Sequence, residues 1–242
     1  MRKAYVESIT EEALKNDKIF QIVSDIGTFT FDKYRESCSD RFLNVGIQEA
    51  SMVGIAAGLA LNEKIPFIYT IAPFLSARSF EPIRVNVCYQ NLNVKIIGCG
   101  SGYTYSTLGC AHHATDDISV MRALPGMTVI SPADPQEVKN VVKALVEHNG
   151  PAYVRIGRDG EPSINPEGYN FRIGKGVTVK NGDDVTIIGT GTSLKNVLRA
   201  YELLIEYDIR ARVINMHTIK PLDEDIIVKA AKETGCIATV EE

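Results

Sequence analysis

The chain has no tryptophan, no paired cysteine motif and little net charge, and each absence narrows what it can be. Its five cysteines are odd in number and scattered without a CxxC pair, so neither a zinc site nor a disulfide framework is indicated. We therefore expect reduced thiols and a cytoplasmic protein. The net charge of −4 predicts no nucleic-acid or anionic-membrane partner. No apolar run approaches the length of a membrane span, and no signal peptide is recognisable.

What is present is ordinary for a globular protein, with 45% apolar and 23% charged residues. Short apolar runs alternate with helical patterns, which favours an α/β fold with a parallel sheet covered on both faces. The strands are expected at residues 19–24, 42–45, 66–70, 94–97, 128–131 and 152–156. The helices are expected after Gln48 and at residues 74–88 (bent near Pro82), 116–124 and 135–148.

Composition also suggests two domains. We expect a first domain over residues 1–160 and a smaller one over 177–242, joined by a polar linker at 161–176. The second domain should contain strands at 185–188, 211–215 and 236–240 and helices at 193–207 and 221–234. Three strands leave an exposed sheet edge, so this domain is expected to be truncated unless another element covers that edge.

Glu49 is the first candidate functional residue. It precedes a helix in which Met52 and Ala56 follow helical spacing on one face, and that spacing places Glu49 on or beside the buried side. A carboxylate directed into a core is costly unless it has a partner. The alternative is an acid at the helix N-terminus that points to solvent and is favoured by the helix dipole.

The second group of candidates follows the strand expected at 94–97. A glycine-rich loop at 98–109 leads into His112 and His113, which could transfer protons or contact a substrate, or could be surface residues. Arg158, beyond the end of a strand, could bind an anion or could be a solvated charge. The turn at 189–193 could accept a phosphate or could be a tight strand-to-helix connection.

Four segments of the chain, in this order and spacing, resemble the transketolase family, and most closely the C-terminal section of enzymes that are split over two chains. They are Arg41–Glu49, Ala72–Arg84, Leu108–Asp117 and His217–Asp223. The resemblance implies a thiamine-diphosphate pyrimidine-binding domain followed by a transketolase C-terminal domain.

The resemblance also assigns roles. The residue that matches Glu49 hydrogen-bonds N1′ of the cofactor's aminopyrimidine ring and promotes its imino tautomer. Phe74 matches the aromatic residue that stacks on this ring, and Asp25 matches an acid near the site. His112 matches a histidine that contacts the donor substrate, with His113 beside it. Arg158 matches an arginine that binds a sugar phosphate.

The chain departs from the family at three points. Leu108 and Gly100 stand where full-length transketolases have donor-contacting residues, and Ala111 replaces a threonine. A GDG motif, which in this family helps Mg²⁺ hold the diphosphate, is absent. The resemblance therefore implies a partner, an N-terminal transketolase-like subunit that carries the diphosphate and metal site, and self-association into an α2β2 heterotetramer.

The expected reaction is transfer of a two-carbon ketol unit between sugar phosphates. One alternative is chemistry like that of 1-deoxyxylulose-5-phosphate synthase, and another is the beta-type subunit of a 2-oxoacid dehydrogenase decarboxylase. A non-catalytic regulatory or assembly protein on the same fold is the alternative from a different class.

Overall fold

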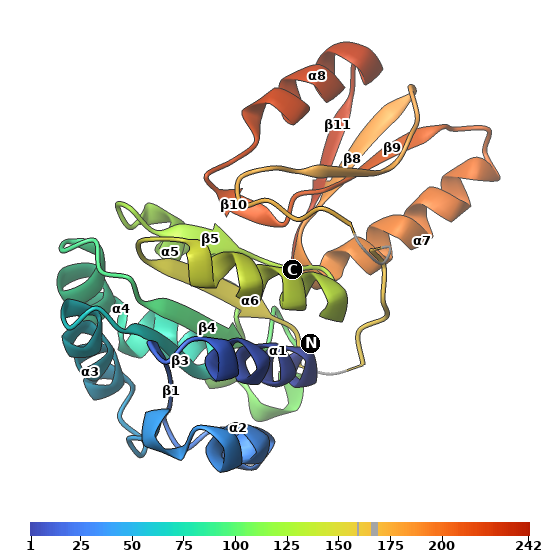
Figure 1. Cartoon of the computed structure of the whole chain (residues 1–242). Coiled ribbons are helices and arrows are strands. Elements are labelled where there is room, and N and C mark those ends of the chain that lie inside the picture. Colours follow the sequence, from blue (N-terminus) through green and yellow to red (C-terminus); the bar gives the residue numbers. More distant parts are fainter. Residues whose placement is uncertain (159, 166–168) are drawn as a thin grey trace.

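The computed structural model describes residues 1–158, 160–165 and 169–242 (Figure 1). Its larger sheet has seven strands in the order β10-β5-β6-β4-β3-β1-β2. All pairs are parallel except β10 against β5. The strands are β1 (Ile19–Val23), β2 (Phe42–Asn44), β3 (Ile65–Ile71), β4 (Lys95–Cys99), β5 (Thr128–Ile130), β6 (Ala152–Ile156) and β10 (Thr218–Lys220). The expected α/β class is confirmed.

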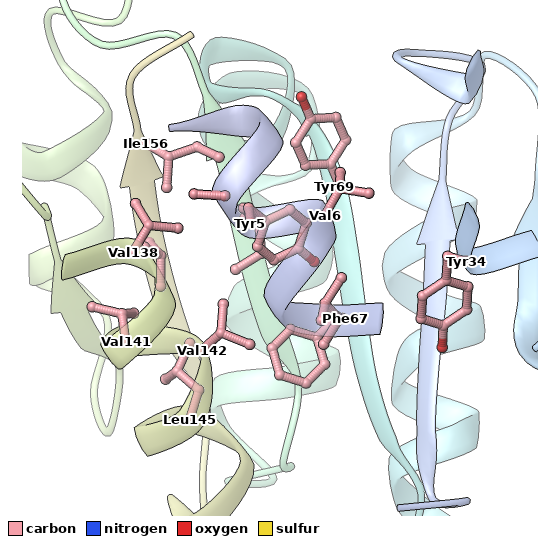
Figure 2. Packing of buried hydrophobic residues seen from close by; sticks show 14 of the residues in the cluster. Tyr5, Val6, Tyr34, Phe67, Tyr69, Val138, Val141, Val142, Leu145 and Ile156 are labelled. Carbon is pink, nitrogen blue, oxygen red and sulfur yellow. The ribbon is translucent and has the colours of Figure 1, made fainter. Parts of the chain in front are cut away.

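Both faces of this sheet are covered by helices. Successive side chains of a strand point to opposite faces, so neighbouring residues of β3 pack in different core clusters. Phe67 and Tyr69 of β3 belong to a core cluster with α1 (Arg2–Lys15) and α6 (Pro135–Glu147). Figure 2 shows Tyr5 of α1 and Val138 of α6 packed in this cluster. Ile68, between the two β3 residues, belongs to the cluster on the opposite face.

That second face is covered by α3 (Glu49–Leu61), α5 (Asp117–Ala123) and an irregular helical segment between β3 and β4. This segment consists of the π turns η3 (Phe74–Arg78) and η4 (Ile83–Cys88) around the short α4 (Phe80–Pro82). The helix and the irregularity near Pro82 were both expected. π turns are rare and are often found at functional sites.

The smaller sheet has four strands in the order β11-β8-β9-β7. They are β7 (Val177–Lys180), β8 (Val185–Gly189), β9 (Ala211–Asn215) and β11 (Ile237–Val240), with helices α7 (Leu194–Ile205) and α8 (Glu224–Thr234). The prediction of three strands was wrong, because β7 adds an antiparallel edge to β9. The last helix begins three residues later than expected, after Asp223.

The helices α1 and α2 (Asp32–Ser37) were not predicted. β10 was not predicted either, and it joins the larger sheet although it follows β9 of the smaller one. Backbone bonds continue this contact, from Ser131 N–H to His217 O at 2.8 Å and from Gly191 N–H to Ser131 O at 3.1 Å. The smaller sheet is therefore tied to the carboxyl end of β5.

The predicted linker, as far as it is described, contains no helix or strand. Its residues 166–168 lie outside the described residues. Within the described ranges, no helix is long and apolar enough to cross a membrane.

Candidate functional site

Glu49 is the first residue of α3, and its side chain is buried. Only 5% of the side chain is exposed, so the alternative of an acid pointing to solvent is wrong. Its Oε1 accepts a hydrogen bond from Nη1 of Arg78 at 3.4 Å. Sequence reasoning did not single out Arg78, although the residue lies in one of the four family-like segments.

Phe74 lies next to this ion pair at the start of η3, directly after β3. Its ring is 9% exposed, and the guanidinium carbon Cζ of Arg78 lies 4.4 Å from the ring centroid. Arg78 therefore contacts the carboxylate and the aromatic face at once. Such a cation over a ring is attracted by the ring quadrupole. Phe80, further along the same segment, is half-buried and packs against the core.

The glycine-rich loop also brings His112 against Phe74. The His112 ring lies 5.1 Å from the Phe74 centroid in an edge-to-face arrangement. Its Nδ1 is buried and has no hydrogen-bond partner in the described structure, which is unusual for a buried polar atom. Gly100 has φ of 91°, and a Cβ there would lie 2.3 Å from the Tyr105 ring, so this position of the loop needs glycine.

Tyr105 links His112 to Arg158. Its ring centroid is 6.1 Å from that of His112, and the Arg158 Cζ lies 5.3 Å from the centre of the tyrosine ring. Sequence reasoning missed Tyr105, for which the only signal was its place in the glycine loop.

We call the continuous set of side chains in contact the site row. It consists of Glu49, Arg78, Phe74, His112, Tyr105 and Arg158. The segments after β3, β4 and β6 supply most of it, at the carboxyl end of the parallel sheet, where open α/β sheets bind ligands.

Two predicted site residues have no contact with the site row among those the structure describes. Asp25, after β1, is exposed and has φ of 56°. Its carboxylate accepts a bond from Nδ2 of Asn44 at 3.1 Å. His113 turns away from His112, with Nε2 3.3 Å from the Ser106 carbonyl oxygen and its ring 4.9 Å from that of Tyr103.

A buried polar cluster supports the end of the loop. Arg155 Nη1 donates to Asp117 Oδ1 at 3.1 Å and to the Ala114 carbonyl oxygen at 3.4 Å. The Tyr153 hydroxyl donates to the other Asp117 oxygen at 2.5 Å. Burial raises the pKa of Asp117, and the Arg155 charge opposes this change. The cluster fixes the backbone just beyond the two histidines.

The turn at 189–193 uses its polar groups within the protein. Ser193 Oγ donates to the carbonyl oxygens of Thr190 and Val240, at 2.7 Å and 3.0 Å. Thr192 donates to a Glu242 carboxylate oxygen and lies 3.2 Å from the hydroxyl of Ser101. These contacts favour the tight-connection interpretation over a phosphate site. In the described part of the chain, no three histidine, cysteine, aspartate or glutamate side chains are grouped so that they could hold a metal ion.

Two known domain families match the chain, one over its first 160 residues and one over most of the remainder. The family described as "Transketolase, pyrimidine binding domain" matches residues 1–160. The family described as "Transketolase, C-terminal domain" matches residues 174–242. The chain therefore belongs to the transketolase family.

Individual relatives are subunits of transketolases. A 6-deoxy-6-sulfo-D-fructose transketolase subunit of Clostridium sp. (strain MSTE9) is 36% identical over 242 residues, which is all of this chain and 75% of that protein. A subunit of the apulose-4-phosphate transketolase of Phocaeicola vulgatus is 39% identical over 243 residues, covering 100% of this chain and 78% of that one.

Solved structures agree with this assignment. One described as "Split gene transketolase, inactive beta4 tetramer" superposes with a TM-score of 0.93 at 38% identity, covering 100% of this chain and 79% of that chain. Transketolase from Campylobacter jejuni has the same fold, with a TM-score of 0.84 at 16% identity, and covers 100% of this chain and 42% of that one.

Membership of the family implies thiamine diphosphate as the cofactor. Glu49 and Phe74 of the site row fit the pyrimidine half of this cofactor. A buried carboxylate beside an aromatic face suits a planar ring that carries hydrogen-bonding nitrogens. The described part of the chain offers no cluster of ligands for Mg²⁺.

Proposed function

We propose that this chain is the pyrimidine-binding subunit of a two-chain transketolase that transfers a two-carbon ketol unit from a ketose phosphate to an aldose. The observation that carries the proposal is the buried Glu49 carboxylate, placed beside the ring of Phe74 by their shared contact with Arg78. When bound, thiamine diphosphate supplies the carbon nucleophile of this reaction.

Each residue of the site row then has a task. Glu49 holds a proton toward ring nitrogen N1′ from a buried position, where a hydrogen bond to charge is stronger than in water. Phe74 orients the pyrimidine ring by stacking. His112 contacts the donor's carbonyl or hydroxyl group, and Arg158 binds its anionic end. Asp25 stays a candidate for cofactor binding and His113 for substrate binding, although neither contacts the site row among the described residues.

The other half of the site comes from a second polypeptide. A partner subunit with the N-terminal transketolase domain holds the diphosphate through Mg²⁺, while this chain, built as domains 1–160 and 177–242 around a linker, self-associates. The relatives named as transketolase subunits, and the tetramer described as inactive, support this division. We expect calorimetry to show little binding of thiamine diphosphate by the isolated chain, and tight binding would contradict the split site.

The donor is expected to be an unusual ketose with a negative charge. Leu108 and Gly100 replace donor-contacting residues of the family, whereas Arg158 keeps a cation on the site row. The substrates named for the relatives, a sulfonated fructose and apulose 4-phosphate, are of this kind. A donor screen should therefore include phosphorylated and sulfonated ketoses, with pyruvate as the test of the synthase alternative.

The decisive experiment replaces Glu49 by glutamine in the reconstituted pair with Mg²⁺ and thiamine diphosphate. We expect Glu49→Gln to lower kcat by at least about 10²-fold, because glutamine keeps the size but loses the acid. The matched control is Glu63→Gln, which removes the same charge at an exposed position just after α3. Undiminished ketol transfer in Glu49→Gln would falsify the role assigned to this residue.

A further inference from the structure

Arg78 is the one residue of the site row that contacts both groups needed for the pyrimidine ring. Its Nη1 lies 3.4 Å from Glu49 Oε1, and its Cζ lies 4.4 Å from the Phe74 ring centroid. Its side chain is 54% exposed, whereas the Glu49 side chain is 5% exposed. A half-exposed arginine therefore reaches inward to a buried carboxylate.

The reason for this contact is the carboxylate itself. A buried charge is costly without a partner. In the structure as described, Arg78 is the only side chain that hydrogen-bonds the carboxylate of Glu49. The arginine therefore supplies the one partner that the described residues give to this carboxylate.

The guanidinium also resembles the ring for which the site is built. It is planar, carries N–H donors in its plane and stacks on aromatic faces. A protonated aminopyrimidine offers the same combination of in-plane donors and a flat, electron-poor face. The roles proposed above direct the ring to the Glu49 carboxylate and the Phe74 face, and Arg78 contacts both of these groups.

We propose that Arg78 is a displaceable substitute for the cofactor's pyrimidine ring, which occupies Glu49 and Phe74 in the free subunit and leaves when the ring docks. This inference rests on the proposed function. The exposure of Arg78 gives it an open path away from the site, because it is the last residue of the π turn η3 and its long side chain lies half in solvent.

The proposal has a measurable cost in affinity. A site that must first release an internal group binds its ligand with an apparent affinity reduced by the fraction of free sites. Because Arg78 is itself half-exposed, its ion pair and its cation–π contact are each expected to be weak, so removing Arg78 should tighten binding by roughly 2- to 10-fold.

The test is calorimetry of thiamine diphosphate binding to the reconstituted pair with Mg²⁺. Arg78→Met keeps the length of the side chain and removes its charge and planar donors. We expect a Kd about 2- to 10-fold lower than that of the wild-type pair. The matched control is Arg84→Met, which removes an exposed arginine of the same helical segment, and its Kd should be unchanged. An unchanged or weaker affinity in Arg78→Met overturns the proposal.

The outcomes separate this inference from the proposed function. If the proposed function fails, the wild-type pair does not bind thiamine diphosphate. If only the substitute role fails, the wild-type pair binds normally and Arg78→Met brings no gain.

A second measurement needs no cofactor. In the full-length isolated chain, Arg78→Met should lower Tm by about 2 °C when Glu49 is present, because the buried carboxylate loses its partner. The same substitution in a Glu49→Gln background should leave Tm unchanged. An equal loss in both backgrounds would show that Arg78 does not act on Glu49.

Discussion

His217 gives the clearest pH-dependent prediction. It lies before β10 at the junction of the two domains, is fully buried, and contacts the Thr218 hydroxyl through Nδ1 at 2.9 Å. The centroids of the Phe171 and His217 rings lie 4.4 Å apart. Burial lowers the pKa of His217 from 6.5 to about 4, and Asp223 partly opposes this change.

The sign follows from proton uptake. Between pH 6.5 and about 4, the histidine takes up a proton in the unfolded chain but stays neutral in the folded one. The stability it contributes is therefore present above pH 6.5 and is lost as the pH falls toward 4. Each pH unit between the two pKa values is worth about 1.4 kcal/mol, which gives a total of about 3 kcal/mol.

Glu137 acts in the opposite direction at the same junction. Burial raises its pKa from 4.5 to about 7, although it accepts bonds from Tyr169, from Asn215 at 2.9 Å and from the Ala133 N–H at 2.6 Å. Its contribution is present in full below pH 4.5 and is lost as the pH rises to about 7. Between pH 4.5 and 6.5 the changes that His217 and Glu137 make to the free energy of unfolding nearly cancel. These two groups together should therefore give the wild-type chain little net change of stability over this range.

The assay is urea unfolding of the wild-type and His217→Phe chains at several values from pH 7 to pH 4.5. Glu137 is common to both chains, so its effect cancels in the difference of their free energies of unfolding. We expect the advantage of the wild type to shrink by about 2–3 kcal/mol as the pH falls over this range. A difference that stays constant with pH would refute the buried neutral histidine.

Two further predictions concern the support of the site row. Arg155→Met leaves the Asp117 carboxylate with Tyr153 as its remaining side-chain partner, and should cost about 3–5 kcal/mol in urea unfolding. A loss below about 1 kcal/mol would show that the pair is not needed. In Gly98→Ala, the added Cβ would lie 2.7 Å from the Tyr153 hydroxyl, so we expect a loss of about 1–3 kcal/mol. The control is Gly58→Ala on α3, where the added Cβ would have no atom of the described residues within 4 Å beyond its own helix, and it should stabilise the chain by about 0.5–1 kcal/mol. A gain in stability in Gly98→Ala as well would contradict the steric argument.

Much of the fold was predictable because local signals were strong. Asp134 followed by Pro135 predicted the start of α6, and the Asp134 side chain does accept a bond from the Glu137 N–H at 2.7 Å. The helix α1 was missed, because polar residues such as Ser8 and Thr10 lie on its buried side and blur the periodicity. β7 and β10 were missed because each short strand depends on a partner that is distant in sequence.

The candidate site was predictable only in part. The helical spacing after Glu49 left a buried and a solvent-facing acid both open, the resemblance to the transketolase family favoured the buried one, and the structure has it buried. Arg78 and Tyr105 were not found, because a charged residue in a helix and a tyrosine in a glycine loop are both common. Their importance lies in contacts with Glu49, Phe74 and His112, which no local pattern encodes.

The sequence by itself determined the strand–helix alternation, the acid at the start of α3 and the family, because periodicity, capping and short motifs act over a few neighbouring residues. Only the tertiary structure decided which side chains share the carboxyl end of the sheet. Glu49 and Arg78 are 29 positions apart, and they meet because parallel strands bring the ends of separate segments to one edge. The same packing decided that His112 faces Phe74 while His113 turns away.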